Sequence, residues 1–304
     1  MNTSIIRSDF LLLSTAIIWG FAFVAQRVGM DYVGPFIFNG VRFALGALVL
    51  LPFILKNRDS SRGIPTKSSP ANTRLVTYGG ITAGIALFSG ASLQQMGLVY
   101  TTAGNAGFIT GLYVVIVPVL GIFFRHKTNT GTWTGAFLAA AGLYLLSVTE
   151  HFTMAFGDLL VLIGAFFWAA HVLIIGWLSP RLDSFRLALI QYTACSALSI
   201  IVSLMIENTT FFSLVQACIP IFYGGVMSVG IAYTLQIMAQ KNAHPAHAAI
   251  ILSLEAVFAA VGGWMILDEV FTPRELLGCA LMLSGMLLSQ LWSFIRSRNR
   301  RIIA

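Results

Sequence analysis

Long apolar runs alternate with short polar stretches along the chain, a pattern that predicts a bundle of membrane-spanning helices. A helix rises about 1.5 Å per residue and a bilayer core is about 30 Å thick, so one crossing needs about 20 apolar residues. We therefore expect an all-α membrane protein with ten transmembrane helices and mostly short connections. The ten runs cover approximately residues 9–29, 34–55, 75–99, 101–124, 130–148, 157–178, 184–206, 213–240, 243–267 and 272–295.

The composition supports this class of protein and argues against others. Of the 304 residues, 57% are hydrophobic and only 10% are charged, whereas soluble domains are about 25% charged. The net charge is +7, but the basic residues lie between apolar runs and form no single patch, so we expect no nucleic-acid partner. The histidines and cysteines lack metal-ligand spacing and no nucleotide-binding motif occurs, so no metal and no cofactor are expected.

The basic residues gather on one side of the predicted bundle. The opposite loops are mainly acidic and hold only Arg27 and Arg274 as basic residues. Because cytoplasmic loops are rich in lysine and arginine, both termini are expected in the cytoplasm of a multi-pass protein of the inner (plasma) membrane. The basic side holds 15 of the 18 lysines and arginines, namely Arg7, Lys56, Arg58, Arg62, Lys67, Arg74, Arg125, Lys127, Arg181, Arg186, Lys241, Arg296, Arg298, Arg300 and Arg301.

Two segments near residues 9 and 158 begin in the same way. Asp9 precedes Trp19 by ten residues, and Asp158 precedes Trp168 by the same spacing. Taken alone, each aspartate is best interpreted as a helix N-cap. The shared spacing, however, indicates an internal repeat.

The same repeat continues further along the chain. At an offset of 142 residues, Gln94 falls on Gln236 and Tyr113 on Glu255. After one extra loop residue, Gly135 and Gly142 fall on Gly278 and Gly285. The halves, 1–150 and 151–304, would each hold five helices, an odd number, so the second half must enter the membrane from the opposite face. This inverted repeat is typical of secondary transporters, which bind substrate near the midplane between the repeats.

The second half carries a recognisable signature. The run AAIILSLEAVFAAVGGWMILDEVFTPRELLGCALMLSGMLL resembles the closing signature of EamA-type members of the drug/metabolite transporter superfamily. The shared features are an intramembrane Glu255, the acidic turn Asp268-Glu269, and Gly278 and Gly285. The resemblance implies a ten-helix carrier with two EamA repeats, a central cavity and peripheral fifth and tenth helices.

The first half fits the same family. Its opening run IIWGFAFVAQRVG and the Arg42-containing second helix resemble EamA sequences, so the resemblance covers essentially the whole chain. Two positions depart from the family pattern. Ala256 stands where proline is common, and 125–127 reads Arg-His-Lys where the fourth helix usually ends in a Gly-Glu turn.

Two ionisable residues lie deep within predicted helices, where insertion of a charge costs at least ~2.5 kcal/mol. Glu255 lies about 15 Å into its helix at 1.5 Å per residue. It is a candidate proton carrier. Arg42 is a candidate to bind a substrate carboxylate or to pair with an acid. The alternative for both is a buried charge pair that stabilises helix packing.

Aromatic and amide side chains complete the predicted site. Trp19 and Trp168 are expected to approach the cavity from opposite halves, and His171 shares a helix face with Trp168. Ligand sites are mostly apolar with a few placed polar groups, which this set resembles. The predicted lining comes from the first, third, fourth, sixth, eighth and ninth helices. The predicted substrate-binding residues are Trp19, Phe23, Gln26, Gln94, Gln95, Asn105, Tyr113, Trp168, His171, Tyr233 and Gln236.

The sequence favours a secondary transporter that works by alternating access. The family resemblance narrows the cargo to a small organic metabolite, such as an amino acid or an amphipathic amine, with export as the direction. The alternatives are an intramembrane enzyme, for which no catalytic spacing is evident, and a receptor or assembly component. We expect a non-enzymatic protein with a small-molecule substrate and the lipid bilayer as partners. The sequence leaves open whether the protein forms a homodimer.

Overall fold

A computed structural model describes residues 3–60, 70–121, 130–147, 154–243, 245–285 and 287–288. Helices dominate these ranges, and residues 273–285 are also helical. The named helices are α1 (Thr3–Gly29), α2 (Pro35–Ser60), α3 (Pro70–Gly97), α4 (Ala103–Gly111), α5 (Tyr113–Gly121), α6 (Thr130–Ser147), α7 (Phe156–Leu178), α8 (Ser184–Ile206), α9 (Phe211–Gln216), α10 (Cys218–Phe222), the π-helix η2 (Tyr223–Tyr233), α11 (Thr234–Ala239), α12 (Pro245–Leu252) and α13 (Glu255–Leu267).

Eight segments of the described chain are long and apolar enough to cross a membrane. They coincide with eight of the ten predicted runs, and the chain is a multi-pass membrane protein. The predicted fifth helix is present as α6, but its apolar stretch, Trp133–Leu146, is shorter than the other spans. The predicted tenth helix extends beyond the described residues. The number of ten transmembrane helices therefore stays a prediction.

Helices of the two halves pack against each other symmetrically: a contact made by a helix of one half has a counterpart made by the equivalent helix of the other half. α1 packs against η2 and α13, and α7, its counterpart, packs against α3 and α5. Likewise α2 contacts η2, while α8 contacts α3. The equivalent helices α2 and α8 also contact each other directly, and α4 packs against α13. The hydrophobic core therefore lies between the halves.

Two predicted helices are interrupted near the middle of their length. The run predicted at 101–124 breaks at Leu112 into α4 and α5. The run predicted at 243–267 breaks at Ser253 and Leu254 into α12 and α13. Leu112 and Leu254 are separated by the repeat offset of 142 residues. Tyr113 and Glu255 therefore occupy equivalent places, each as the first residue after the break.

The eighth predicted span, 213–240, is also not one regular helix. It comprises α9, α10, η2 and α11, and η2 is π-helical over 11 residues. π-Helical turns are rare and occur mostly at functional sites. The equivalent helix of the first half, α3, is a regular α-helix of 28 residues.

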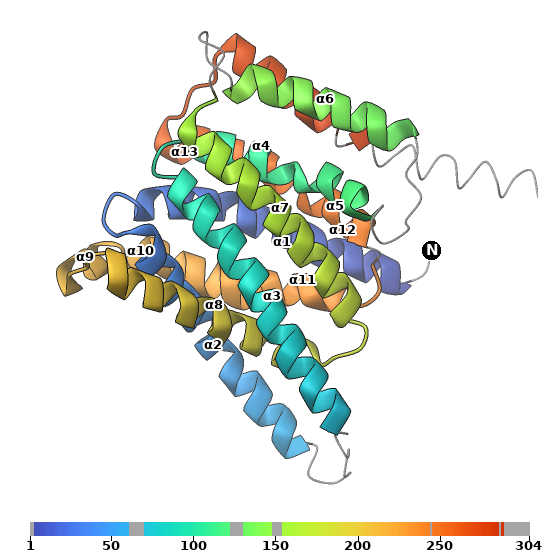
Figure 1. Cartoon of the computed structure of the whole chain (residues 1–304), viewed down its shortest axis with the longest axis vertical. Helices are drawn as coiled ribbons and strands as arrows, with labels where there is room; N and C mark the ends of the chain where they lie inside the picture. Colours follow the sequence, from blue (N-terminus) through green and yellow to red (C-terminus); the bar gives the residue numbers. More distant parts are fainter. Residues whose placement is uncertain are drawn as a thin grey trace, which may run out of the picture.

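α6 lies along one edge of the molecule, with the C-terminal helix beside it (Figure 1). Glycines permit this contact: a Cβ atom on Gly142 would lie 2.5 Å from the Gly278 carbonyl oxygen, and one on Gly285 would lie 2.5 Å from that of Gly135. Small residues of this kind allow membrane helices to approach closely. These four are the glycines that the repeat had aligned.

Candidate functional site

Side chains from both halves enclose a small central cavity. Its open space is about 30 Å³, room for about two water molecules, so the cavity is nearly closed in this conformation. It is lined by Trp19, Ala22, Phe23, Gln26, Arg42, Gln94, Thr110, Tyr113, Trp168, His171, Val172, Ser228, Tyr233, Gln236 and Glu255. The first half contributes α1 to α5 and the second contributes α7, η2, α11 and α13.

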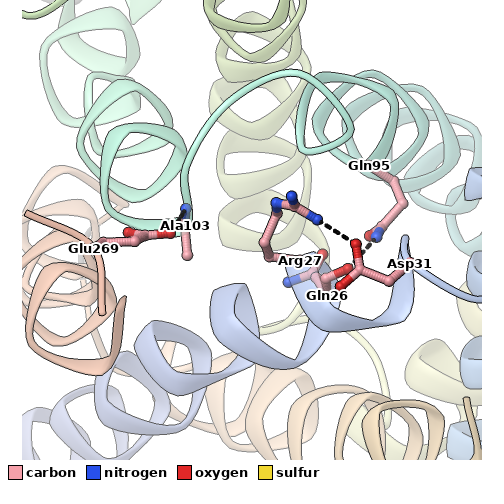
Figure 2. Close-up of polar contacts among 6 residues, drawn as sticks. All are labelled: Gln26, Arg27, Asp31, Gln95, Ala103 and Glu269. Atoms are coloured by element: carbon pink, nitrogen blue, oxygen red, sulfur yellow. Dashed lines mark hydrogen bonds and ion pairs between the residues drawn. The ribbon is translucent and has the colours of Figure 1, made fainter. Parts of the chain in front are cut away.

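Most of the predicted site residues meet here, including the two deep charges, and two do not. Gln95 is not part of the cavity lining, and its side chain donates a hydrogen bond to the Gln26 carbonyl oxygen at 3.1 Å (Figure 2). Asn105 lines a different, outer cavity. One helix was missing from the predicted lining, because α2 reaches the cavity through Arg42. The residues brought together are Trp19, Phe23, Gln26, Arg42, Gln94, Tyr113, Trp168, His171, Tyr233, Gln236 and Glu255.

Tyr233 is the hub of the aromatic wall. Its ring centre lies 4.5 Å from that of Trp19 and 6.1 Å from that of Trp168. The His171 ring meets Tyr233 edge-on at 6.2 Å, and His171 Nε2 lies 2.9 Å from the Gln191 amide oxygen. The matched tryptophans therefore meet on one tyrosine. The cavity presents flat apolar faces with polar edges.

A chain of side-chain hydrogen bonds crosses the first-half side of the cavity. Gln94 Nε2 donates to Gln26 Oε1 at 3.1 Å. Gln94 Oε1 accepts from Trp168 Nε1 at 2.9 Å and from the Thr110 hydroxyl at 3.4 Å. These bonds fix the orientation of Trp168 from the opposite half.

The cavity contains one guanidinium group and one carboxyl group. Arg42 is buried between Phe38 and Phe43, with its guanidinium carbon 5.5 and 5.1 Å from their ring centres. Its Nε donates to Asn39 Oδ1 at 3.0 Å. Within the described ranges no carboxylate forms a salt bridge with Arg42. Its positive charge is thus available to an anionic group.

Glu255 interacts across the halves with its repeat equivalent. The carboxyl group of Glu255 lies next to the phenol of Tyr113. Both side chains are almost completely buried. Neither deep charge, therefore, is half of a buried ion pair in the part of the chain that the structure describes.

A larger outer cavity of about 720 Å³ opens beside the C-terminal ends of α1 and α13. Its wall includes Asn105, and Arg27 forms an ion pair with Asp31 there at 2.9 Å (Figure 2). It lies at the membrane face that carries the acidic loops. The ionisable residues in its wall are Arg27, Asp31, Asp158, Glu269, Arg274 and Glu275.

Carboxylates of the second half cap helices of the first half at this end. Glu269 accepts hydrogen bonds from the backbone nitrogens of Ala103 (2.7 Å) and Gly104 (3.0 Å) at the start of α4 (Figure 2). Glu207 accepts from those of Phe36 (2.9 Å) and Ile37 (2.8 Å) at the start of α2. Helix N-termini favour negative charge because their first amides lack partners.

The repeated aspartates also join the halves, which corrects their interpretation as N-caps. Asp9 lies well inside α1, and its Oδ1 is 2.7 Å from His247 Nε2 of α12. Asp158 lies in the first turn of α7, after the N-cap Ala155, and accepts from the Thr101 hydroxyl at 2.5 Å. Both aspartates therefore form side-chain contacts, here called ties, that connect the two halves.

The sequence matches the EamA-like transporter family twice, over residues 6–148 and over residues 155–291. This chain belongs to the EamA-like transporter family. The resemblance to EamA-type carriers is thereby confirmed, and the fold is the EamA two-repeat fold. The exact division at residue 150 stays a prediction.

Relatives of the EamA-like chain are also transporters. An uncharacterized transporter of Archaeoglobus fulgidus is 32% identical over 286 residues, covering 93% of this chain and 86% of the relative. YoaV, an uncharacterized transporter of Bacillus subtilis, is 23% identical over 95% of this chain and 97% of its own length. YedA of Escherichia coli, an uncharacterized inner membrane transporter, is 26% identical over 52% of this chain and 49% of its own length.

A solved crystal structure has the same fold as this EamA-like chain. It superposes with a TM-score of 0.68, covers 98% of this chain and 99% of the other, and is 18% identical in sequence. The acidic turn of the EamA signature acquires a structural role, since Asp268 adopts the left-handed conformation (φ 53°) that ends α13 and Glu269 caps α4. The departing residues 125–127 lie outside the described ranges.

Some lining residues escaped the sequence prediction. Thr110 lies in α4, before the break that separates it from Tyr113, so helical spacing from Tyr113 is no reliable signal for it. Ser228 offered none, because its place depends on the π-helix. Gln191 of α8, which holds His171, lies outside the cavity lining and has no counterpart among the matched repeat positions.

Proposed function

We propose that this EamA-like protein is a secondary carrier that exports a small organic metabolite by alternating access, and that it is not an enzyme. The substrate is an amphipathic amino acid or amine. One observation carries the proposal: a guanidinium group and a carboxyl group without ion-pair partners among the described residues share one aromatic cavity between the halves. Substrate sites in inverted-repeat transporters lie at this interface.

The chemistry of the cavity supports this substrate class. Arg42 suits a carboxylate, since guanidinium groups bind carboxylates through paired hydrogen bonds. Glu255 suits an ammonium group or a coupling proton. Trp19, Trp168 and Tyr233 suit an apolar or aromatic side group and attract cations through their ring faces.

The two cavities support a transport path. The central cavity is nearly closed, and the outer cavity of about 720 Å³ lies at the acidic end of the bundle. We infer that this end faces away from the cytoplasm, that both termini are cytoplasmic, and that the protein lies in the inner membrane. The ties at Asp9–His247 and Asp158–Thr101, at opposite ends, would open alternately.

Counterflow in proteoliposomes tests the proposal. Vesicles loaded with an unlabelled amino acid or amine should accumulate the same labelled compound, and protein-free vesicles should not. Absence of counterflow across a panel of zwitterions, amines and organic anions would refute transport of this substrate class. Accumulation of anions alone would leave Arg42 as the anchor and remove Glu255 from substrate binding.

A further inference from the structure

Two glutamines occupy equivalent places in the two halves. Gln94 and Gln236 are separated by the repeat offset of 142 residues. Both line the central cavity, and their exposed fractions are 5% and 1%. Inverted repeats would give them the same hydrogen bonds, but the structure gives them different ones.

Both the nitrogen and the oxygen of the Gln94 amide form hydrogen bonds with the protein. Its nitrogen donates to Gln26, and its oxygen accepts from Trp168 and from Thr110. Gln94 is therefore a positioning residue that holds the Trp168 ring. Because the Gln94 oxygen already accepts two hydrogen bonds, it has none left to accept from a ligand.

Among the described residues the Gln236 amide has no hydrogen-bond partner. Neither its nitrogen nor its oxygen forms a hydrogen bond with any described residue, and no other described side chain leaves both amide atoms buried in this way. By symmetry Trp19 would donate to Gln236, as Trp168 does to Gln94. Instead, Trp19 Nε1 donates to the Ser228 backbone carbonyl at 3.3 Å.

The π-helix explains this difference between the halves. Ser228 lies within η2, and Gln236 follows it in α11. Bonding from i to i+5 changes the angular position of later residues relative to an α-helix such as α3. The Gln236 side chain therefore departs from the place of Gln94, and the indole finds a backbone acceptor.

A buried amide without a hydrogen bond destabilises a protein, and a methionine of similar size would avoid that penalty. The amide lines a cavity beside Arg42 and Glu255, neither of which has an ion-pair partner among the described residues. A ligand in this cavity can supply both a donor and an acceptor. We propose that Gln236 is a specificity-determining residue that recognises a neutral hydroxyl or carboxamide on the substrate. The inference rests on the proposed transport function and adds a third contact to those of Arg42 and Glu255.

Matched methionine variants test the inference. Wild-type, Gln236→Met and Gln94→Met proteins are compared in counterflow with similarly shaped pairs: asparagine and leucine, tyrosine and phenylalanine, tyramine and phenethylamine. The wild type should prefer the polar member of at least one pair. Gln236→Met should lower that preference by about tenfold, the effect of one or two neutral hydrogen bonds. An unchanged preference in Gln236→Met would overturn the inference.

Thermal unfolding of the same variants gives a second, independent readout. Gln94→Met breaks three hydrogen bonds and should lower Tm by about 5 °C, whereas Gln236→Met should not lower it. Equal losses of Tm would mean that the protein satisfies the Gln236 amide, which would overturn the inference even without transport data. If the wild type moves no compound of any pair, the proposed function fails, and the Tm comparison still decides whether the amide is free.

Discussion

The two interrupted helices have the same geometry and different chemistry. α4–α5 and α12–α13 break at equivalent leucines, and each resumes at a residue that faces the central cavity. In the first half that residue is Tyr113, and in the second it is Glu255. The repeat has thus kept a backbone feature in both copies and a carboxyl group in only one.

The comparison shows how a symmetric fold can carry an asymmetric site. Because Tyr113 and Glu255 are neighbours, the symmetric positions form one contact near the centre of the molecule. Under the proposed function, a single proton or ammonium group bound there would be shared by both halves. α3 and η2 differ in the same sense, because one is regular and the other is π-helical.

The largest expected effect follows from removal of the single carboxyl. Glu255→Gln keeps the shape of the side chain but cannot exchange a proton. We expect uphill transport driven by a pH gradient to fall at least about 100-fold, the scale of losing an essential acid–base group. Substrate binding should persist if the group carries protons. Proteoliposome transport and ligand-dependent Tm measure the two properties separately.

Stability distinguishes this role from a structural one. Breaking a buried ion pair would cost about 3–5 kcal/mol, but Glu255 has no such cation partner among the described side chains. We therefore expect Glu255→Gln to unfold within about 2 °C of the wild type. Normal transport in a normally stable Glu255→Gln protein would contradict its central role.

Moving the carboxyl by symmetry sharpens the comparison. In Tyr113→Glu/Glu255→Tyr the group shifts only to the neighbouring equivalent position. We expect about one tenth of wild-type uphill transport, since a small misplacement of a working group costs rate without abolishing the chemistry. Recovery no greater than for Glu255→Tyr alone, in a stable protein, would show that the carboxyl must come from the second half.

Arg42→Met should have the next largest effect. Loss of the guanidinium should reduce counterflow of zwitterions about 30-fold, the effect of a charge-assisted hydrogen bond, while simple amines should lose much less. No described carboxylate is left unpaired by this change, so Tm should be nearly unchanged. Equal losses for zwitterions and amines would contradict carboxylate binding by Arg42.

The membrane spans were predictable because they depend on local properties. A run of about 20 apolar residues identifies a span whatever its neighbours. The helix breaks were not predicted, since the hydrophobic run continues through Leu112 and the single Gly111 beside it does not by itself end a helix in a run so rich in glycine. The π-helix was equally hidden, because hydrophobic runs at 213–240 carry no signal for i to i+5 bonding.

The site was predictable where helices are regular. Trp19, Phe23 and Gln26 share one face of α1, and all three reach the cavity. Asn105 was assigned to the face of Tyr113 by α-helical spacing, but the intervening break invalidates that spacing and Asn105 lies in the outer cavity.

The smallest effects are expected at Glu269 and Glu207, two carboxylates that each cap the N-terminus of a helix from the other half. Glu269 caps the interrupted α4, and Glu207 caps the continuous α2. Each glutamine variant keeps an oxygen acceptor but loses the negative charge opposite the helix N-terminus. We expect each change to cost about 1 kcal/mol of unfolding free energy, within the range for caps and helix dipoles. Thermal unfolding of Glu269→Gln and Glu207→Gln measures this cost.

Because α4 carries Thr110 and leads directly into Tyr113, Glu269→Gln should also reduce transport by about twofold, the rate equivalent of a few tenths of a kcal/mol. Glu207→Gln serves as the matched control with the same loss of charge and a smaller change in transport. Equal transport losses in both variants would mean that the caps act only through stability, and that the break in α4–α5 gives its cap no special influence on the site.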